Sequence, residues 1–232
     1  MQQSIQAVKN IVLVHGAFAD GSGWKKLYEI LKQKGYRVSV VGNPNTGLDE
    51  DVAATKRVLD RQDGPSILVG HSYGGGVITA AGNLPSVAGL VYISAFAPDE
   101  GETLGELLGS YPTDPKSGIL PPADGFIWYD TEKFHSGFCQ DIPEEEASFM
   151  ADSQVPVALS ALIQKFTDVA WKTKPTWYIV AKQDHTIPPD LERFMGKRTG
   201  GKVSEIDGSH LIFISHAEEV AAIIESAATG SR

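Results

Sequence analysis

The sequence is nearly free of cysteine, and it contains neither a long apolar run nor a cluster of basic residues. Cys139 is the only cysteine in the 232-residue chain, so no disulfide can form within it, and this favours a reducing compartment. The first apolar run, Ile11–Val14, is too short for the core of a signal peptide. No stretch approaches the ~20 apolar residues that span a membrane. We therefore expect a cytoplasmic protein with no membrane partner.

Charge and motif content exclude further classes of protein. The net charge of −9, from 29 acidic and 20 basic residues, argues against nucleic acid as a partner. No group of Cys and His residues has the spacing of metal ligands, and neither a phosphate loop nor a dinucleotide-binding motif is present. We expect no metal and no cofactor. A small-molecule substrate is the partner that remains. The oligomeric state is not fixed, and a homodimer stays open.

Short apolar segments alternate with helical patterns along most of the chain. Within 24–31 and 220–227, apolar side chains recur at i, i+3, i+4 and i+7, the spacing of one helix face. Strands that alternate with helices form a parallel sheet covered on both faces. We therefore predict an α/β fold. Six segments are predicted to be strands, the last more exposed than the others: Ile11–Val14, Val38–Val41, Ile67–Val69, Leu90–Ile93, Trp177–Val180 and Lys202–Ile206.

The alternation stops between Pro98 and Lys174, where Gly, Pro and acidic residues are frequent. A structureless loop of this length is implausible in a compact domain. We expect a core formed by residues 1–97 and 175–232 and an inserted, mainly helical cap formed by residues 98–174. The aromatic residues of this segment are interpreted as a small core of the cap, with the lining of a pocket as the alternative: Phe126, Trp128, Tyr129, Phe134, Phe138 and Phe149.

The most informative motif is Gly70-His71-Ser72-Tyr73-Gly74, which follows the apolar segment Ile67–Val69 and precedes a helical pattern. In this context, Gly-x-Ser-x-Gly predicts a tight strand-to-helix turn that exposes the serine hydroxyl above the sheet. The free N–H groups of the new helix would point into the same space. We therefore interpret Ser72 as a nucleophile.

A serine nucleophile requires a base, and the base requires an acid that orients it. His210 follows the last predicted strand, at the edge of the sheet where Ser72 also lies. It is the preferred base, whereas His15 and His71 are interpreted as structural. Asp184 and Asp99 both follow strands at this edge. We prefer Asp184 because its strand should neighbour the one that leads to His210.

A tetrahedral intermediate also requires two backbone N–H donors near the nucleophile. The residue after the serine, Tyr73, would supply one. Ala17, in the loop after the first strand, would supply the other. We place two aromatic residues in the substrate-binding pocket: Phe18 and Trp128.

Four segments together resemble the α/β-hydrolase superfamily: Val14-His15-Gly16-Ala17, the Ser72 motif, the strand-end Asp184 and Gly208-Ser209-His210. The short chain and the segment 95–99 are similar to those of the plant methyl esterases, the hydroxynitrile lyases and their bacterial relatives. The resemblance implies Ser72, Asp184 and His210 as a catalytic triad. It also implies that Ala17 and Tyr73 form the oxyanion hole.

The resemblance further implies that Ile11–Val14 lies between Val38–Val41 and Ile67–Val69 in a six-stranded parallel sheet, without the two N-terminal strands of the full fold. It leaves three functions open. The first is a serine hydrolase that cleaves a small carboxylic ester through an acyl-enzyme. The second is a hydroxynitrile lyase or another carbon–carbon lyase, and the third is a ligand receptor without turnover. Gly16 stands where the lyases commonly carry Thr, which favours hydrolysis.

Overall fold

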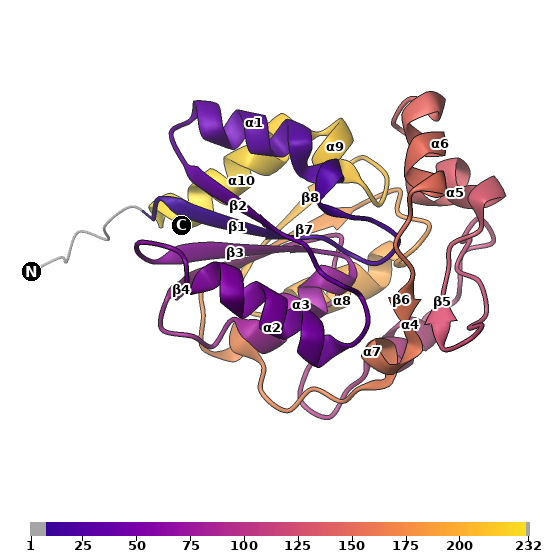
Figure 1. The fold of residues 1–232 in the computed structure, drawn as a ribbon, viewed down its shortest axis with the longest axis horizontal. Coiled ribbons are helices and arrows are strands. Elements are labelled where there is room, and N and C mark those ends of the chain that lie inside the picture. The colour runs from indigo at the N-terminus through magenta and orange to yellow at the C-terminus, as the bar shows by residue number, and fades with distance from the viewer. Residues whose placement is uncertain (1–7, 231–232) are drawn as a thin grey trace, which may run out of the picture.

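The structure is a computed structural model that describes residues 8–230 (Figure 1). The core elements that precede residue 98 are β1 (Asn10–Val14), the 3-10 helix η1 (Gly21–Trp24), α1 (Lys25–Gln33), β2 (Arg37–Val41), α2 (Leu48–Leu59), β3 (Ser66–His71), α3 (Tyr73–Ala81) and β4 (Val87–Ile93). Those that follow residue 174 are β7 (Thr176–Ala181), α8 (Pro189–Arg198), β8 (Lys202–Ile206), α9 (Ile212–Ser215) and α10 (Ala217–Thr229).

The described core strands form one six-stranded parallel sheet in the order β2-β1-β3-β4-β7-β8. All six predicted strands are present, and β1 lies between β2 and β3 as predicted. Every residue of β1, β3 and β7 is buried, as expected of central strands that helices cover on both faces. By contrast, β8 is an edge strand and exposes Lys202, Val203 and Glu205.

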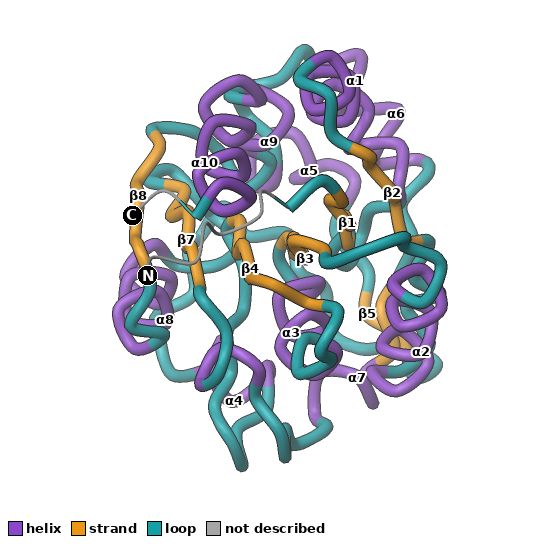
Figure 2. Tube along the Cα trace, turned by 90° about the vertical axis from the view of Figure 1, so that its left-hand side faces the viewer, coloured by secondary structure: helices purple, strands orange, loops and turns teal. Residues whose placement is uncertain are grey.

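Helices cover both faces of this sheet. Helices α1, α9 and α10 lie on one face, and α2, α3 and α8 lie on the other (Figure 2). The buried side chains of α10 include Val220, Ile224 and Ala227, which follow the predicted helical spacing. The alternation of strand and helix therefore produces the three-layered architecture expected from the sequence.

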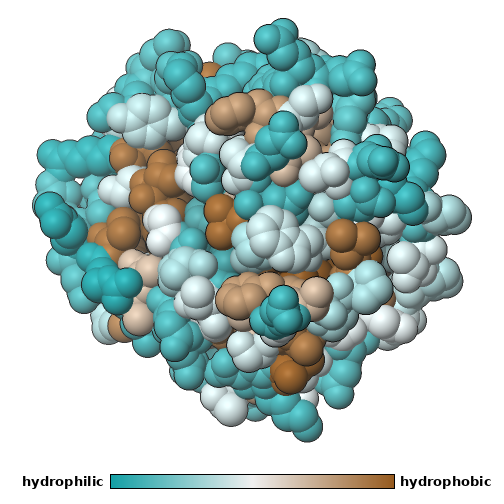
Figure 3. Space-filling view, turned by 45° about the vertical axis from the view of Figure 1, so that its right-hand side comes forward, coloured by the Kyte–Doolittle hydropathy of each residue, from teal (hydrophilic) through white to brown (hydrophobic). Residues whose placement is uncertain are grey.

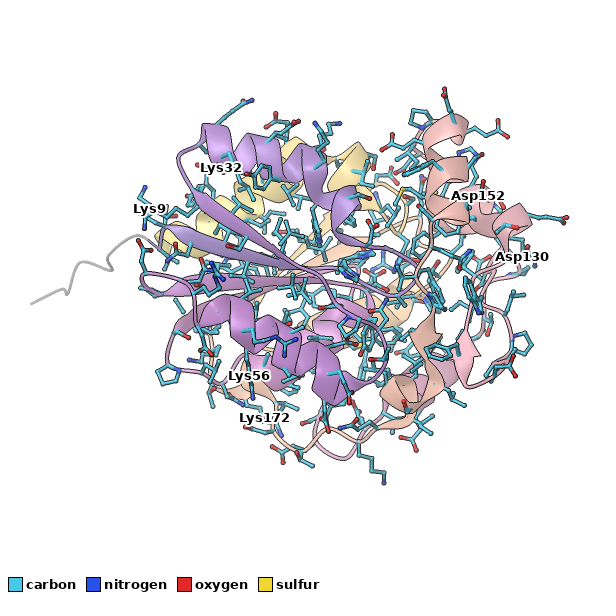
Figure 4. The ribbon with its side chains drawn as sticks, in the orientation of Figure 1. Lys9, Lys32, Lys56, Asp130, Asp152 and Lys172 are labelled. Carbon is cyan, nitrogen blue, oxygen red and sulfur yellow. The ribbon has the colours of Figure 1, made fainter. Side chains whose placement is uncertain are left out.

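Most of residues 98–174 lie at one end of the sheet, on the right of Figure 1, and the last part, which includes Lys172, runs below the sheet (Figure 4). Their elements are α4 (Leu104–Gly109), β5 (Phe126–Ile127), α5 (Thr131–Phe138), α6 (Glu144–Asp152), β6 (Val157–Ala158), α7 (Leu159–Ile163) and η2 (Ala170–Lys172). The sequence did not predict β5 and β6, an antiparallel pair of two residues each, because such segments are too short to show periodicity. We call the segment 98–174 the cap.

Three of the six cap aromatics that the sequence analysis assigns to a small core form such a core. Tyr129, Phe134 and Phe138 are buried, with ring centroids 4.8–5.5 Å apart. Phe126 is partly buried. Trp128 and Phe149 are exposed. The cap end of the molecule, turned forward in Figure 3, shows hydrophobic side chains among hydrophilic ones. The interpretation of these six aromatic residues as a small core of the cap therefore holds for three of them.

The cap carries the net charge of the protein. It contains 14 Asp and Glu residues but only five Lys and Arg residues, so the rest of the chain is neutral overall. Figure 4 shows Asp130 and Asp152 on the cap, at the end of the molecule opposite to Lys9 and Lys32. Among the helices of residues 8–230, none combines the length and the apolar character needed to cross a membrane.

Candidate active site

Ser72 lies on the turn between β3 and α3, where its backbone has a φ of 53° and a ψ of −124°. A serine rarely adopts this positive φ, so the turn is strained. Close backbone packing maintains it. A Cβ at Gly70 would lie 2.5 Å from the carbonyl oxygen of Gly74, and one at Gly74 would lie 2.5 Å from that of Val14. Only glycine fits at these two positions, which explains the motif.

His210 and Asp184 are brought together by the loops that follow β8 and β7. The imidazole Nδ1–H donates to Asp184 Oδ2, and both side chains are fully buried. Asp184 Oδ1 accepts the backbone N–H of Thr186 at 2.6 Å and that of Ile187 at 2.9 Å. The loop thus binds one oxygen of the carboxylate, and the other oxygen accepts the hydrogen bond from His210.

The second ring nitrogen of His210 is available to accept a proton. Among the described residues, no group is hydrogen-bonded to His210 Nε2. His71 Nε2 donates to the His210 carbonyl oxygen at 3.0 Å, and the two rings lie 4.6 Å apart. These contacts fix His210 beside the residue that precedes Ser72. Among the described residues, no hydrogen bond joins the Ser72 hydroxyl and His210 Nε2.

Asp99, the alternative acid, lies elsewhere. Its carboxylate forms an ion pair with Lys172 at 2.7 Å and is partly exposed. The remaining histidines also have other partners within the described residues: His135 contacts the Ile142 carbonyl, His185 contacts Asp114, and His216 contacts Ser215. Asp184 is therefore the strand-end carboxylate that contacts His210.

Two N–H groups lie beside the Ser72 turn without a backbone partner. Tyr73 is the first residue of α3, and the N–H of that position has no acceptor within a helix. Within residues 8–230, the backbone N–H of Ala17 forms no hydrogen bond. The backbone N–H of the next residue, Phe18, donates to the Val155 carbonyl at 2.9 Å. His15 fixes this loop, because Nδ1 donates to the Gly16 carbonyl and Nε2 accepts the Asn43 N–H.

The sequence profile of the alpha/beta hydrolase family matches residues 11–223, which is most of the chain. The chain belongs to this family. Its relatives place it in the branch of the plant methylesterases and hydroxynitrile lyases, which also has bacterial members.

Two relatives and one solved structure illustrate the similarity. A carbendazim hydrolyzing esterase of Nocardioides sp. (strain SG-4G) is 33% identical over 165 residues, which cover 62% of this chain and 64% of that protein. Methylesterase 8 of Arabidopsis thaliana is 24% identical over 81% of this chain and 76% of that protein. A crystal structure of a pyrethroid hydrolase has a TM-score of 0.82 and 25% identity, and covers 95% of this chain and 98% of that one.

A small cavity of about 50 Å³ adjoins Ser72 in this α/β hydrolase. Its lining is almost entirely apolar and combines core and cap: Ala17, Phe18, Ser72, Tyr73, Phe96, Leu104, Gly105, Leu108, Ile119, Val157, Leu162, Thr186 and Ile187. Phe18, one of the two residues expected in the pocket, lines it. The cavity lies between the Ser72 turn and the cap.

Trp128, the other residue expected in the pocket, lies outside this cavity. Its side chain is 44% exposed and does not line the cavity, whereas the flanking Ile127 and Tyr129 are buried. Successive side chains of an extended segment point to opposite faces, so the burial of the two neighbours turns Trp128 to solvent.

Two buried carboxyl groups near the site were missed by sequence reasoning. The Tyr73 hydroxyl donates to Asp51 Oδ2 at 2.5 Å, and Asp51 Oδ1 accepts the Asn45 N–H at 2.8 Å. Burial raises the pKa of Asp51. The second group, Glu192, lies near Asp184. Both residues occur near helix starts, where acidic residues usually reflect the helix dipole, so no signal in the sequence marks them.

Proposed function

We propose that this protein is a serine hydrolase that cleaves a small carboxylic ester through an acyl-enzyme on Ser72. The observation that carries the proposal is the buried His210, which is held by Asp184 and has a free Nε2 beside the strained Ser72 turn. The names of the relatives support it, since they include a carbendazim hydrolyzing esterase, a pyrethroid hydrolase and several methylesterases.

The chemistry follows from these positions. His210 Nε2 takes the Ser72 proton as Oγ attacks the ester carbonyl carbon, and the oxygen that becomes negative is stabilised by the N–H groups of Ala17 and Tyr73. The imidazolium then gives its proton to the departing alkoxide. Water then gives a proton to His210 as its oxygen attacks the acyl carbon. The imidazolium returns this proton to Ser72 Oγ as the bond between Oγ and the acyl group breaks and the carboxylic acid leaves. Asp184 keeps the Nδ1–H in place throughout and stabilises the charged ring.

The cavity and the cap indicate what the substrate carries. The cavity lining includes no charged side chain, so a buried acyl group should be uncharged. The cap contains all of the net charge of −9 and would repel anions from the site while favouring departure of the carboxylate product. We infer a neutral ester whose group next to Ser72 is small and apolar.

The structure gives a physical reason to favour hydrolysis over cyanohydrin cleavage. A Cβ at Gly16 would lie 2.7 Å from the Ser72 Cβ and 3.0 Å from the His71 carbonyl oxygen. A threonine at this position, as the lyases commonly have, would collide with the Ser72 turn. The site therefore has no room for the threonine hydroxyl that the lyases commonly have at this position.

Steady-state hydrolysis of p-nitrophenyl esters tests the proposal. We expect multiple turnover, with kcat/KM rising with pH across the neutral range, because the base must be a neutral imidazole. Burial lowers the pKa of both His15 and His71, so these two rings stay neutral across this range and should not produce the rise. A profile flat from about pH 5 to 8 would contradict His210 as base.

The same assays distinguish the three functions. Absence of turnover would favour a receptor, and cleavage of a cyanohydrin instead of esters would favour a lyase.

A further inference from the structure

Glu192 is a buried carboxyl group that the proposed mechanism does not use. It lies on α8, which packs against β7, and its exposed fraction is 0%. Oε2 accepts the backbone N–H of Ala181 at 2.9 Å, at the end of β7. Oε1 forms no hydrogen bond that meets standard geometry with any described residue. An ionised carboxylate with a single donor is strongly disfavoured in such a place.

Its neighbour is Asp184, the proposed catalytic acid, which lies in the loop after the same strand. The Asp184 N–H donates to the Ala181 carbonyl at 3.3 Å, and the N–H of the same Ala181 donates to Glu192. A carboxylate offers about four acceptor positions, and Asp184 uses three, for the N–H groups of Thr186, Ile187 and His210. One position remains. Burial and the adjacent Asp184 carboxylate raise the pKa of Glu192 well above its ordinary range, since two carboxylates side by side do not both ionise readily.

We propose that Glu192 is a positioning residue that retains its proton and directs it to the free acceptor position of Asp184. This inference rests on the proposed function, in which Asp184 orients His210. The hydrogen bond would keep Asp184 ionised and fixed against His210. It would also keep Glu192 neutral, so that no second negative charge stabilises the His210 imidazolium.

The other ionisable groups near Glu192 and Asp184 have other partners and do not donate a proton to Asp184. Tyr178, on β7, donates its hydroxyl to the Ala95 carbonyl. Arg193 points to the surface and is paired with Asp190 and Glu205. On the far side of His210, His71 is neutral because burial lowers its pKa. Glu192 is therefore the acid beside Asp184 that can supply a proton.

Two substitutions separate the role of the proton from that of the side-chain volume. Glu192→Gln keeps an acceptor for the Ala181 N–H and gains an N–H donor toward Asp184, whereas Glu192→Met has neither. We expect kcat/KM of Glu192→Gln to stay within about twofold of the parent. The pH profile of kcat/KM rises on its acid side, which we call the acid limb, and the midpoint of this limb should be unchanged. Glu192→Met should lose on the order of tenfold in kcat with little change in KM, and its acid limb should move to higher pH.

Two outcomes of these assays would overturn the proposal. A shift of the acid limb to lower pH in Glu192→Gln would mean that Glu192 is ionised in the parent and acts as a second negative charge. Equal activity and equal pH profiles in the Gln and Met variants would mean that the donor plays no part.

Thermal unfolding tests the retained proton without any assay of activity. Because the folded pKa of Glu192 is raised, its stabilising contribution is complete below the unfolded pKa of about 4.3 and is lost as pH rises toward the folded value. Glutamine has no such loss. The Tm of Glu192→Gln minus that of the parent should therefore increase as the pH is raised from about 4.5 to 8.

Glu205→Gln is the matched control. Glu205 is a partly exposed carboxylate on β8 whose pKa is lowered by Arg193, so its stabilising contribution is complete above the unfolded pKa of about 4.3 and is lost only at lower pH. Its Tm difference should therefore stay nearly constant between about pH 5 and 8. A Tm difference for Glu192→Gln that does not increase with pH would disprove the retained proton. If esters are not substrates at all, this measurement still decides the protonation of Glu192, and the two failures can be told apart.

Discussion

Replacement of Ser72 by alanine is expected to lower kcat for ester hydrolysis on the order of 10³-fold or more. The substitution removes the atom that would form the acyl bond. It leaves the turn intact, because the Ser72 side chain makes no hydrogen bond among those the described residues form and the Cβ is retained. The measurement is the initial rate with a p-nitrophenyl ester, with circular dichroism to verify the fold. Retention of about a tenth of the parental rate would exclude Ser72 as the nucleophile.

Ser94→Ala provides the matched control for this variant. Ser94 also follows a central strand, β4, and is buried with a positive φ of 44°. Its hydroxyl has no hydrogen-bond partner among the described residues, and it does not line the cavity beside Ser72. We expect near-parental activity. A comparable loss in both variants would indicate that disturbance of the strand ends, rather than loss of a nucleophile, abolishes activity.

Replacement of Asp184 by asparagine should lower kcat on the order of 10²–10⁴-fold. The N–H groups of Thr186 and Ile187 require an acceptor, so the asparagine Oδ1 would stay with them and its NH₂ group would face His210. His210 would then have to accept through Nδ1 and carry its proton on Nε2. In that tautomer the ring cannot take the Ser72 proton.

Asp99→Asn is the control for the acid. Asp99 contacts Lys172 at the surface, where the loss of one exposed ion pair contributes little. Its kcat should stay near the parental value. If Asp99→Asn proves more damaging than Asp184→Asn, the assignment of the acid is incorrect.

The sheet was predictable from the sequence because its central strands are buried on both faces. Such strands appear as nearly continuous apolar runs, and β1, β3 and β7 have this character over their whole length. The contact between His210 and Asp184 follows from the same pattern. Both residues come directly after neighbouring strands, so a parallel sheet brings them to one edge.

The cap was less predictable because its elements are short and its side chains alternate between interior and solvent within two or three residues. Trp128 shows this most clearly, since its aromatic character suggested a pocket and only the burial of its neighbours places it outside. The burial of Glu192 near Asp184 was not predicted from the sequence for another reason. A glutamate in the first turn of a helix usually faces solvent, and only the packing of α8 on β7 turns this one toward Asp184.

Titration with diethyl p-nitrophenyl phosphate tests the central claim most directly, because this compound phosphorylates an activated serine and the adduct is hydrolysed slowly. We predict stoichiometric release of p-nitrophenol, inactivation, and a diethylphosphoryl group located by mass spectrometry on the peptide that contains Ser72. The Ser72→Ala variant should release no p-nitrophenol under the same conditions. A label on any other residue, or equal release by Ser72→Ala, would contradict the assignment of Ser72 as the nucleophile.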